Sequence, residues 1–69
     1  MQGRDIRAAR KAAGVTQEEL VDRMNIAVGG FSVGALIAIE NERIGVSEAS
    51  AEQFIAAIDA IRAEKEAGR

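Results

Sequence analysis

The sequence contains no cysteine and no histidine, and these two absences exclude several kinds of functional site. Without cysteine the chain can form neither a disulfide nor a thiolate metal centre, and a zinc site would have to use carboxylates alone. Histidine and cysteine are also the usual bases and nucleophiles of enzymes near neutral pH. We therefore expect no cofactor, no metal site and no catalytic residue, and we expect that the protein is not an enzyme.

From the sequence we expect neither a secretory leader nor an apolar run long enough to cross a membrane. Residues 1–5 do not have the charged-then-apolar layout of a leader, so the expected location is the cytoplasm. The nearly apolar stretch Met24–Ile39 would span about 24 Å as a helix, less than the roughly 30 Å hydrocarbon core of a bilayer. Its glycines weaken a membrane-spanning helix further. We expect this stretch to form part of a core and of a protein interface, with no membrane contact.

Basic residues are concentrated at one end of the chain, although the formal net charge of the whole sequence is −2. Residues 1–11 hold four basic residues and one acid, whereas residues 12–61 hold two arginines and eight acids. A net-acidic chain is an unusual DNA-binding protein, but a local basic face suffices where phosphates touch only one edge. In this chain that face would belong to the first helix.

The length of 69 residues allows one domain at most. A chain of this size buries only about 60% of the surface that it exposes when unfolded, so we expect modest stability that a dimer would raise. We expect a core over about residues 3–62. The charged tail over residues 63–69 should fray.

The segment Gly14–Leu20 predicts the end of one helix and the start of the next within a few residues. Gly14 can adopt the left-handed backbone that ends a helix, and the Thr16 side chain can cap the helix that follows. Glu19 stands three residues after Thr16, where a capping box places an acid. Two helices joined by such a tight turn are the skeleton of a DNA-binding motif.

Apolar residues at helical spacing predict three helices over about residues 3–13, 17–24 and 33–41, and a fourth that runs to about Ala67. The apolar positions of these helices are Ile6, Ala9 and Ala13, then Leu20, Val21 and Met24, then Leu36, Ile37 and Ile39, and finally Ala51, Phe54, Ile55, Ile58 and Ile61. Any exposed apolar surface on so small a protein would mark an oligomer contact, which Ile58 and Ile61 could extend.

Polar residues at the helix boundaries predict how each later helix begins or ends. Ser32 is expected to cap the third helix, and Asn41 can adopt the left-handed position after it that glycine usually fills. Ser47 and Ser50 both suit the cap of the fourth helix. Ser50 together with Gln53 would make a second capping box.

Two blocks of the sequence resemble one protein family. The segment Ile6–Leu20 (IRAARKAAGVTQEEL) resembles the start of the Cro and phage-repressor type of helix-turn-helix domain, often called XRE-like. The segment Leu36–Arg43 (LIAIENER), followed by Ser47, resembles the end of that family's recognition helix, its loop and the cap of its fourth helix. The resemblance implies an all-α, lambda-repressor-like domain of four, or at most five, helices.

The resemblance also indicates that the turn before the recognition helix has been lengthened. The turn in the family is about three residues long, so Asn25–Phe31 would contain roughly five additional residues. Gly29 and Gly30 allow the chain to reverse there. We expect that Ile26, Val28 and Phe31 fold back on the core.

By resemblance, the protein is a repressor-like transcriptional regulator that binds a two-fold symmetric operator in double-stranded DNA as a homodimer. Arg10 and Glu40 stand where the family has a buried salt bridge, and their implied role is structural. The implied DNA-contacting residues are Thr16, Gln17, Ser32, Val33, Gly34, Ala35, Arg43, Arg7 and Lys11.

Other interpretations of these residues stay open. Thr16 and Gln17 are compatible with an ordinary helix start, and the basic residues with ordinary solvated charges. The expected recognition helix offers only one serine from the residue types that read base edges. The alternative function is therefore a helix-turn-helix scaffold that binds a protein partner through the apolar residues 26–39, without specific DNA binding.

Overall fold

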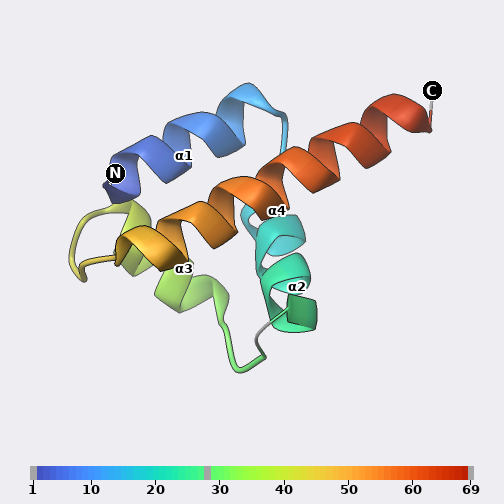
Figure 1. Ribbon diagram of the computed structural model, residues 1–69. Coiled ribbons are helices and arrows are strands. Elements are labelled where there is room, and N and C mark those ends of the chain that lie inside the picture. The colour runs from blue at the N-terminus through green and yellow to red at the C-terminus, as the bar shows by residue number, and fades with distance from the viewer. Residues whose placement is uncertain (1, 28, 69) are drawn as a thin grey trace.

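The computed structural model describes residues 2–27 and 29–68, and this part of the chain is all-helical, with no strand (Figure 1). The helices are α1 (Gly3–Ala12), α2 (Gln17–Ala27), α3 (Val33–Glu40) and α4 (Glu48–Ala67). All four predicted helices are therefore present. The second helix runs three residues beyond its expected end at Met24, so the first part of the lengthened segment is helical.

The longest helix, α4, runs alongside α1 in Figure 1 and contacts both α1 and α2, while α3 packs against α1 and α2. Their apolar faces meet in one core, and each fully buried aliphatic or aromatic side chain contributes about 1.5–3 kcal/mol to it. The buried apolar residues are Ile6, Val15, Leu20, Val21, Met24, Leu36, Ile39, Ala51, Phe54, Ala57, Ile58 and Ile61.

Two expectations about apolar residues need correction. Ile58 and Ile61 do not extend a surface patch, because both face the core and are only 2% and 6% exposed. Ile26 does not fold back on the core, since it is 82% exposed. The cause is the extra length of α2: Ile26 stands about 200° around the helix from buried Met24 and points to solvent. Val28 lies outside the described residues.

Phe31, by contrast, packs on the core as expected. Its ring lies 5.3 Å from that of Phe54 in α4, centroid to centroid, at an interplanar angle of 59°. This tilted arrangement is a favourable one for two aromatic rings. It fixes the end of the segment that leads into α3.

The junction between α1 and α2 has the predicted local chemistry. Gly14 has a positive φ of 69°. The Val15 N–H donates to the Arg10 carbonyl at 3.0 Å across this turn, which ends α1. The Thr16 N–H donates to Glu19 Oε1 at 3.0 Å and the Glu19 N–H donates to Thr16 Oγ1 at 3.1 Å, so the capping box is present.

The end of α3 differs from the prediction by one residue. Asn41 has a φ of −89°, and it is Glu42 that adopts the left-handed conformation, with a φ of 61°. The reason is that Glu40 is the last helical residue, so the left-handed position falls two residues later. The Arg43 N–H then donates to the Ala38 carbonyl at 2.8 Å and closes the turn.

Serine side chains cap the last two helices. Ser32 accepts from the Ala35 N–H at 3.1 Å, as predicted. Ser47, and not Ser50, caps α4, because the Ser50 N–H donates to Ser47 Oγ at 3.1 Å. The prediction of a second capping box from Ser50 and Gln53 is therefore wrong, because both residues lie inside α4, after its cap.

The start of α1 lies directly against the end of α3. A Cβ atom added to Gly3 would stand 1.7 Å from the carbonyl oxygen of Ile39, far inside a van der Waals contact. Only glycine permits this approach. The contact fixes the angle between the two helices at one end.

The last turns of α4 also contact the rest of the protein. Lys65 Nζ donates to the Gly14 carbonyl at 2.8 Å and to Glu19 Oε1 at 2.9 Å, and Arg23 of α2 pairs with Glu64. These contacts tie the charged C-terminal turns to α2 and to the turn before it.

Candidate nucleic-acid interface

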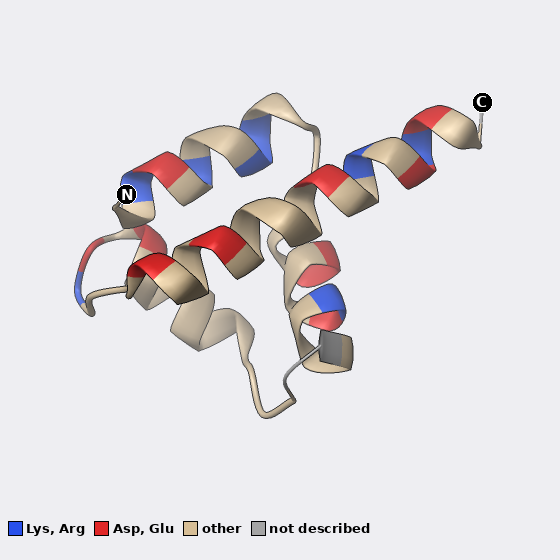
Figure 2. Cartoon of the chain, viewed as in Figure 1, with Lys and Arg blue, Asp and Glu red and all other residues tan. Residues whose placement is uncertain are grey.

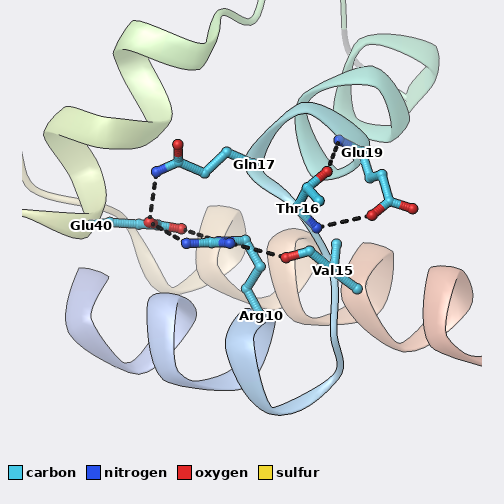
Figure 3. A network of polar contacts seen from close by, with 6 residues as sticks. All are labelled: Arg10, Val15, Thr16, Gln17, Glu19 and Glu40. Atoms are coloured by element: carbon cyan, nitrogen blue, oxygen red, sulfur yellow. Dashed lines mark hydrogen bonds and ion pairs between the residues drawn. The ribbon is translucent and has the colours of Figure 1, made fainter.

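Arg10 and Glu40 form a buried ion pair that joins α1 to α3 (Figure 3). Arg10 Nε donates to Glu40 Oε2 at 2.7 Å and Arg10 Nη2 donates to Glu40 Oε1 at 3.1 Å. Arg10 Nη1 also donates to the Val15 carbonyl at 2.9 Å, so the same guanidinium holds the turn before α2. The two side chains are 9% and 2% exposed, and bidentate geometry of this kind resists rotation.

Gln17 completes this network from the first turn of α2. Its Nε2 donates to Glu40 Oε1 at 3.2 Å, and Figure 3 shows the side chain directed from α2 toward α3. Glu40 therefore receives hydrogen bonds from both α1 and α2. The two contacts hold the start of α2 at a fixed place beside the end of α3.

An open groove of about 490 Å³ lies beside this network, between the C-terminal half of α1 and the start of α2. Arg7 and Lys11 are exposed residues of α1 that line it together with Thr16 and Gln17. Four predicted DNA-contacting residues are thus brought to one site. The N–H groups of the first helical turn also lie at this end of α2, where the helix dipole favours an anion.

Acidic side chains moderate the positive character of this end of α2. Glu18 and Glu19 stand in its first turn. The pKa of Glu19 is lowered, first by the hydrogen bond from the Thr16 N–H and then by Lys65, and both contacts favour the charged carboxylate. The two positive charges of Arg7 and Lys11 equal the two negative charges of Glu18 and Glu19 in number, and Lys65 pairs with one of these acids, Glu19.

The other predicted DNA-contacting residues do not line this groove. Ser32, Val33, Gly34 and Ala35 belong to the cap and first turn of α3, where Val33 packs against the core and the Ser32 oxygen serves as the cap. Gly34 is exposed, and so is the later residue Ile37, at 37%. The surface of α3 ahead of Glu40 carries no charge, as Figure 2 shows.

Arg43 lies in the loop between α3 and α4, beside the opposite end of α1 from the groove. The neighbouring loop residues Glu42 and Ile44 line a shallow cavity with Gln2 and Gly3 of the α1 start. Arg43 is exposed, and Glu42 lies 3.9 Å from Arg4. Arg43 is therefore not among the residues that line the groove with Arg7 and Lys11.

Several contacts around the site could not be read from the sequence. The hydrogen bond from Gln17 to Glu40 and those from Lys65 to Gly14 and Glu19 join residues 23 or more positions apart. No pattern of neighbouring residues in the sequence predicts these hydrogen bonds. The one available signal for Gln17 was its place in the block that resembles the repressor family.

Comparisons with family models, with curated proteins and with solved structures found no match to this chain. Within residues 2–27 and 29–68, no helix has the length and apolar character that crossing a membrane requires.

Proposed function

We propose that this chain is a helix-turn-helix DNA-binding protein of the lambda-repressor-like type and acts as a sequence-specific transcriptional regulator. The motif would consist of α2 and α3. The observation that carries the proposal is the Arg10 guanidinium, which binds Glu40 of α3 and the Val15 carbonyl at once. It holds the motif rigid and leaves neighbouring Arg7 and Lys11 on the surface beside the start of α2.

In this proposal, the groove binds the DNA backbone. Arg7 and Lys11 would neutralise one or two phosphates, and Thr16, Gln17 and the first-turn N–H groups would donate hydrogen bonds to them. Arg43 would contact a second stretch of backbone from the loop after α3. Such contacts fix the register of a protein on DNA without reading its sequence.

The surface of α3 would then meet the major groove with few polar side chains. Gly34 permits close approach, and exposed Ile37 and half-buried Ala35 can contact thymine methyl groups. Readout of this kind depends on methyl pattern and DNA shape more than on hydrogen bonds. As a homodimer, the protein would place two such helices about 34 Å apart on a two-fold symmetric operator. This role requires the cytoplasmic location that the sequence predicts.

One observation favours a second function, the binding of a protein partner. Ile26 is 82% exposed and Ile37 is 37% exposed, both within an uncharged segment that stands before Glu40. Large exposed apolar side chains more often mark protein contacts than DNA contacts. An apolar contact of this kind would respond little to salt, whereas phosphate binding weakens steeply with it.

The proposal is tested by equilibrium binding of the purified protein to DNA from the region around its own gene and to random DNA, each at two salt concentrations. Preferential binding that weakens steeply at the higher salt concentration is the expected result. Sedimentation of the complex should give two chains per operator. Absence of binding at the lower salt concentration would refute the DNA-binding function and favour the protein partner.

A further inference from the structure

The side chain of Asn25 binds the backbone of a residue that lies outside its own helix. Its Nδ2 donates to the Phe31 carbonyl oxygen at 2.9 Å, and its Oδ1 accepts from the Phe31 N–H at 2.6 Å. One side-chain amide thereby satisfies both backbone groups of Phe31, as a neighbouring strand does in a β-ladder. Asn25 and Phe31 are the first and last residues of the lengthened segment 25–31, which leads from α2 to α3.

Phe31 is also held from the side of α4, and it leads directly into α3. Its ring packs on Phe54, which is 2% exposed and belongs to the core. The next residue, Ser32, caps α3 by accepting the Ala35 N–H. A single peptide bond therefore connects the residue that Asn25 holds to the cap of α3.

We propose that Asn25 is a positioning residue, whose amide sets where α3 begins relative to α2. This inference rests on the proposed function in one respect, because the place of α3 affects binding only if α3 faces DNA. Gly29 and Gly30 both have positive φ angles, 76° and 66°, which glycine adopts without cost. Without the Asn25 contacts, these glycines would let the backbone before α3 move, and the Phe31 ring on Phe54 would be left to hold the residue before the Ser32 cap.

Two variants separate this role from a general contribution to stability. Asn25→Ala removes both hydrogen bonds, and Asn25→Asp keeps the shape of the side chain but has no donor for the Phe31 carbonyl at neutral pH. Alanine is a better helix former than asparagine, so Asn25→Ala does not act by weakening α2. Gln53→Ala, which truncates an exposed amide of α4, is the matched control.

Amide hydrogen exchange of the free protein tests the positioning role without DNA. The wild-type Phe31 amide should be protected. Asn25→Ala should speed exchange at Phe31 and in α3 about tenfold, the effect of losing one or two hydrogen bonds, while exchange in α1 and α4 stays unchanged. Asn25→Asp still accepts from the Phe31 N–H, so it should speed exchange in α3 without exposing the Phe31 amide. An unprotected Phe31 amide in the wild type would overturn the proposal. So would unchanged exchange in α3, or faster exchange in all four helices together.

Affinity for operator and for random DNA then tests the consequence for binding. Asn25→Ala, which leaves the charge of the chain unchanged, should bind the operator about tenfold more weakly, yet bind random DNA as the wild type does, because phosphate attraction does not require an exact place for α3. Gln53→Ala should match the wild type on both. Equal losses on both DNAs would contradict the proposal. If the wild type prefers no DNA, the regulatory function fails, and hydrogen exchange still decides the role of Asn25.

Discussion

Arg10 is a buried charged residue, and the fold depends on its ion pair with Glu40. Its guanidinium satisfies both oxygens of the Glu40 carboxylate and the Val15 carbonyl, and the ion pair is buried. Removal of water from two charges is costly, and only good geometry and further hydrogen bonds offset the cost. The pair is therefore better regarded as a device that fixes helix angles than as a large net source of stability.

Arg10→Ala should lower the free energy of unfolding by about 3–5 kcal/mol, because it leaves the Glu40 carboxylate buried without its partner. Chemical denaturation followed by circular dichroism measures the loss. The matched control is Arg4→Ala, since Arg4 is an exposed arginine of the same helix, 3.9 Å from Glu42, and its removal should cost about 0–1 kcal/mol. Similar losses in the two variants would contradict the structural role of the buried pair.

At the scale of elements, the angle between α1 and α3 is fixed at two points along α1. One is the Arg10 ion pair, and the other is the contact of Gly3 with the Ile39 carbonyl. The backbone cannot move away at one point without disturbing the other. This rigidity places the basic side of α1 beside the start of α2.

Gly3→Ala should destabilise the fold by about 1–3 kcal/mol, because the added methyl group would overlap a backbone oxygen that no side-chain rotation can move. Thermal unfolding measures the effect. Gly45→Ala is the control, since a Cβ at Gly45 would meet no atom within 4 Å. An unchanged midpoint for Gly3→Ala would mean that α1 and α3 are less closely packed than described.

The attachment of the α4 C-terminal turns should depend on pH. Hydrogen bonds lower the pKa of Glu19, through the Thr16 N–H and then Lys65, and that of Glu64, through Arg23. Groups whose pKa is lower in the folded state stabilise it fully above the ordinary glutamate pKa of about 4.3, and this contribution is lost as the pH falls through the lowered values. The protection of amides near Lys65, taken from the exchange rate relative to the intrinsic rate at each pH, should therefore fall on acidification below about pH 4.3.

Lys65→Ala provides the comparison for this titration. It removes the partner that links Glu19 to α4, so amides at the end of α4 should be less protected near neutral pH, and their protection should change less on acidification. If the wild type and the variant show the same pH profile, the ion pair does not hold the C-terminal turns. Raised salt should weaken the same contacts, because they are exposed.

At the scale of the whole molecule, the sequence predicted those helix ends and caps that depend only on residues close together in the chain. Gly14, the Thr16 and Glu19 box and the Ser32 cap follow from local backbone chemistry, and the Arg10 and Glu40 pair followed from the family resemblance. The exposure of Ile26 and the contacts of Asn25 could not be predicted, because they depend on where α2 ends. The close approach at Gly3 depends on a residue 36 positions away.

The sequence predicted which residues belong to the candidate site, but it did not predict which of them lie together. Arg7, Lys11, Thr16 and Gln17 do share one groove, whereas Arg43 and the first turn of α3 lie elsewhere. Charge patterning along the chain identified the basic helix but could not place it in space. Only the packed helices determine which basic residues can act on the same phosphates.

The salt dependence of DNA affinity in an Arg7→Ala, Lys11→Ala double variant tests the DNA-binding account most directly. Each phosphate contact contributes about 0.9 to the slope of log affinity against log salt, so the double variant should lose up to about 1.8 from the wild-type slope. Arg62→Ala, which removes an exposed arginine of α4 outside the groove, should keep the slope unchanged. An undiminished slope in the double variant would contradict the assignment of this groove to phosphate binding.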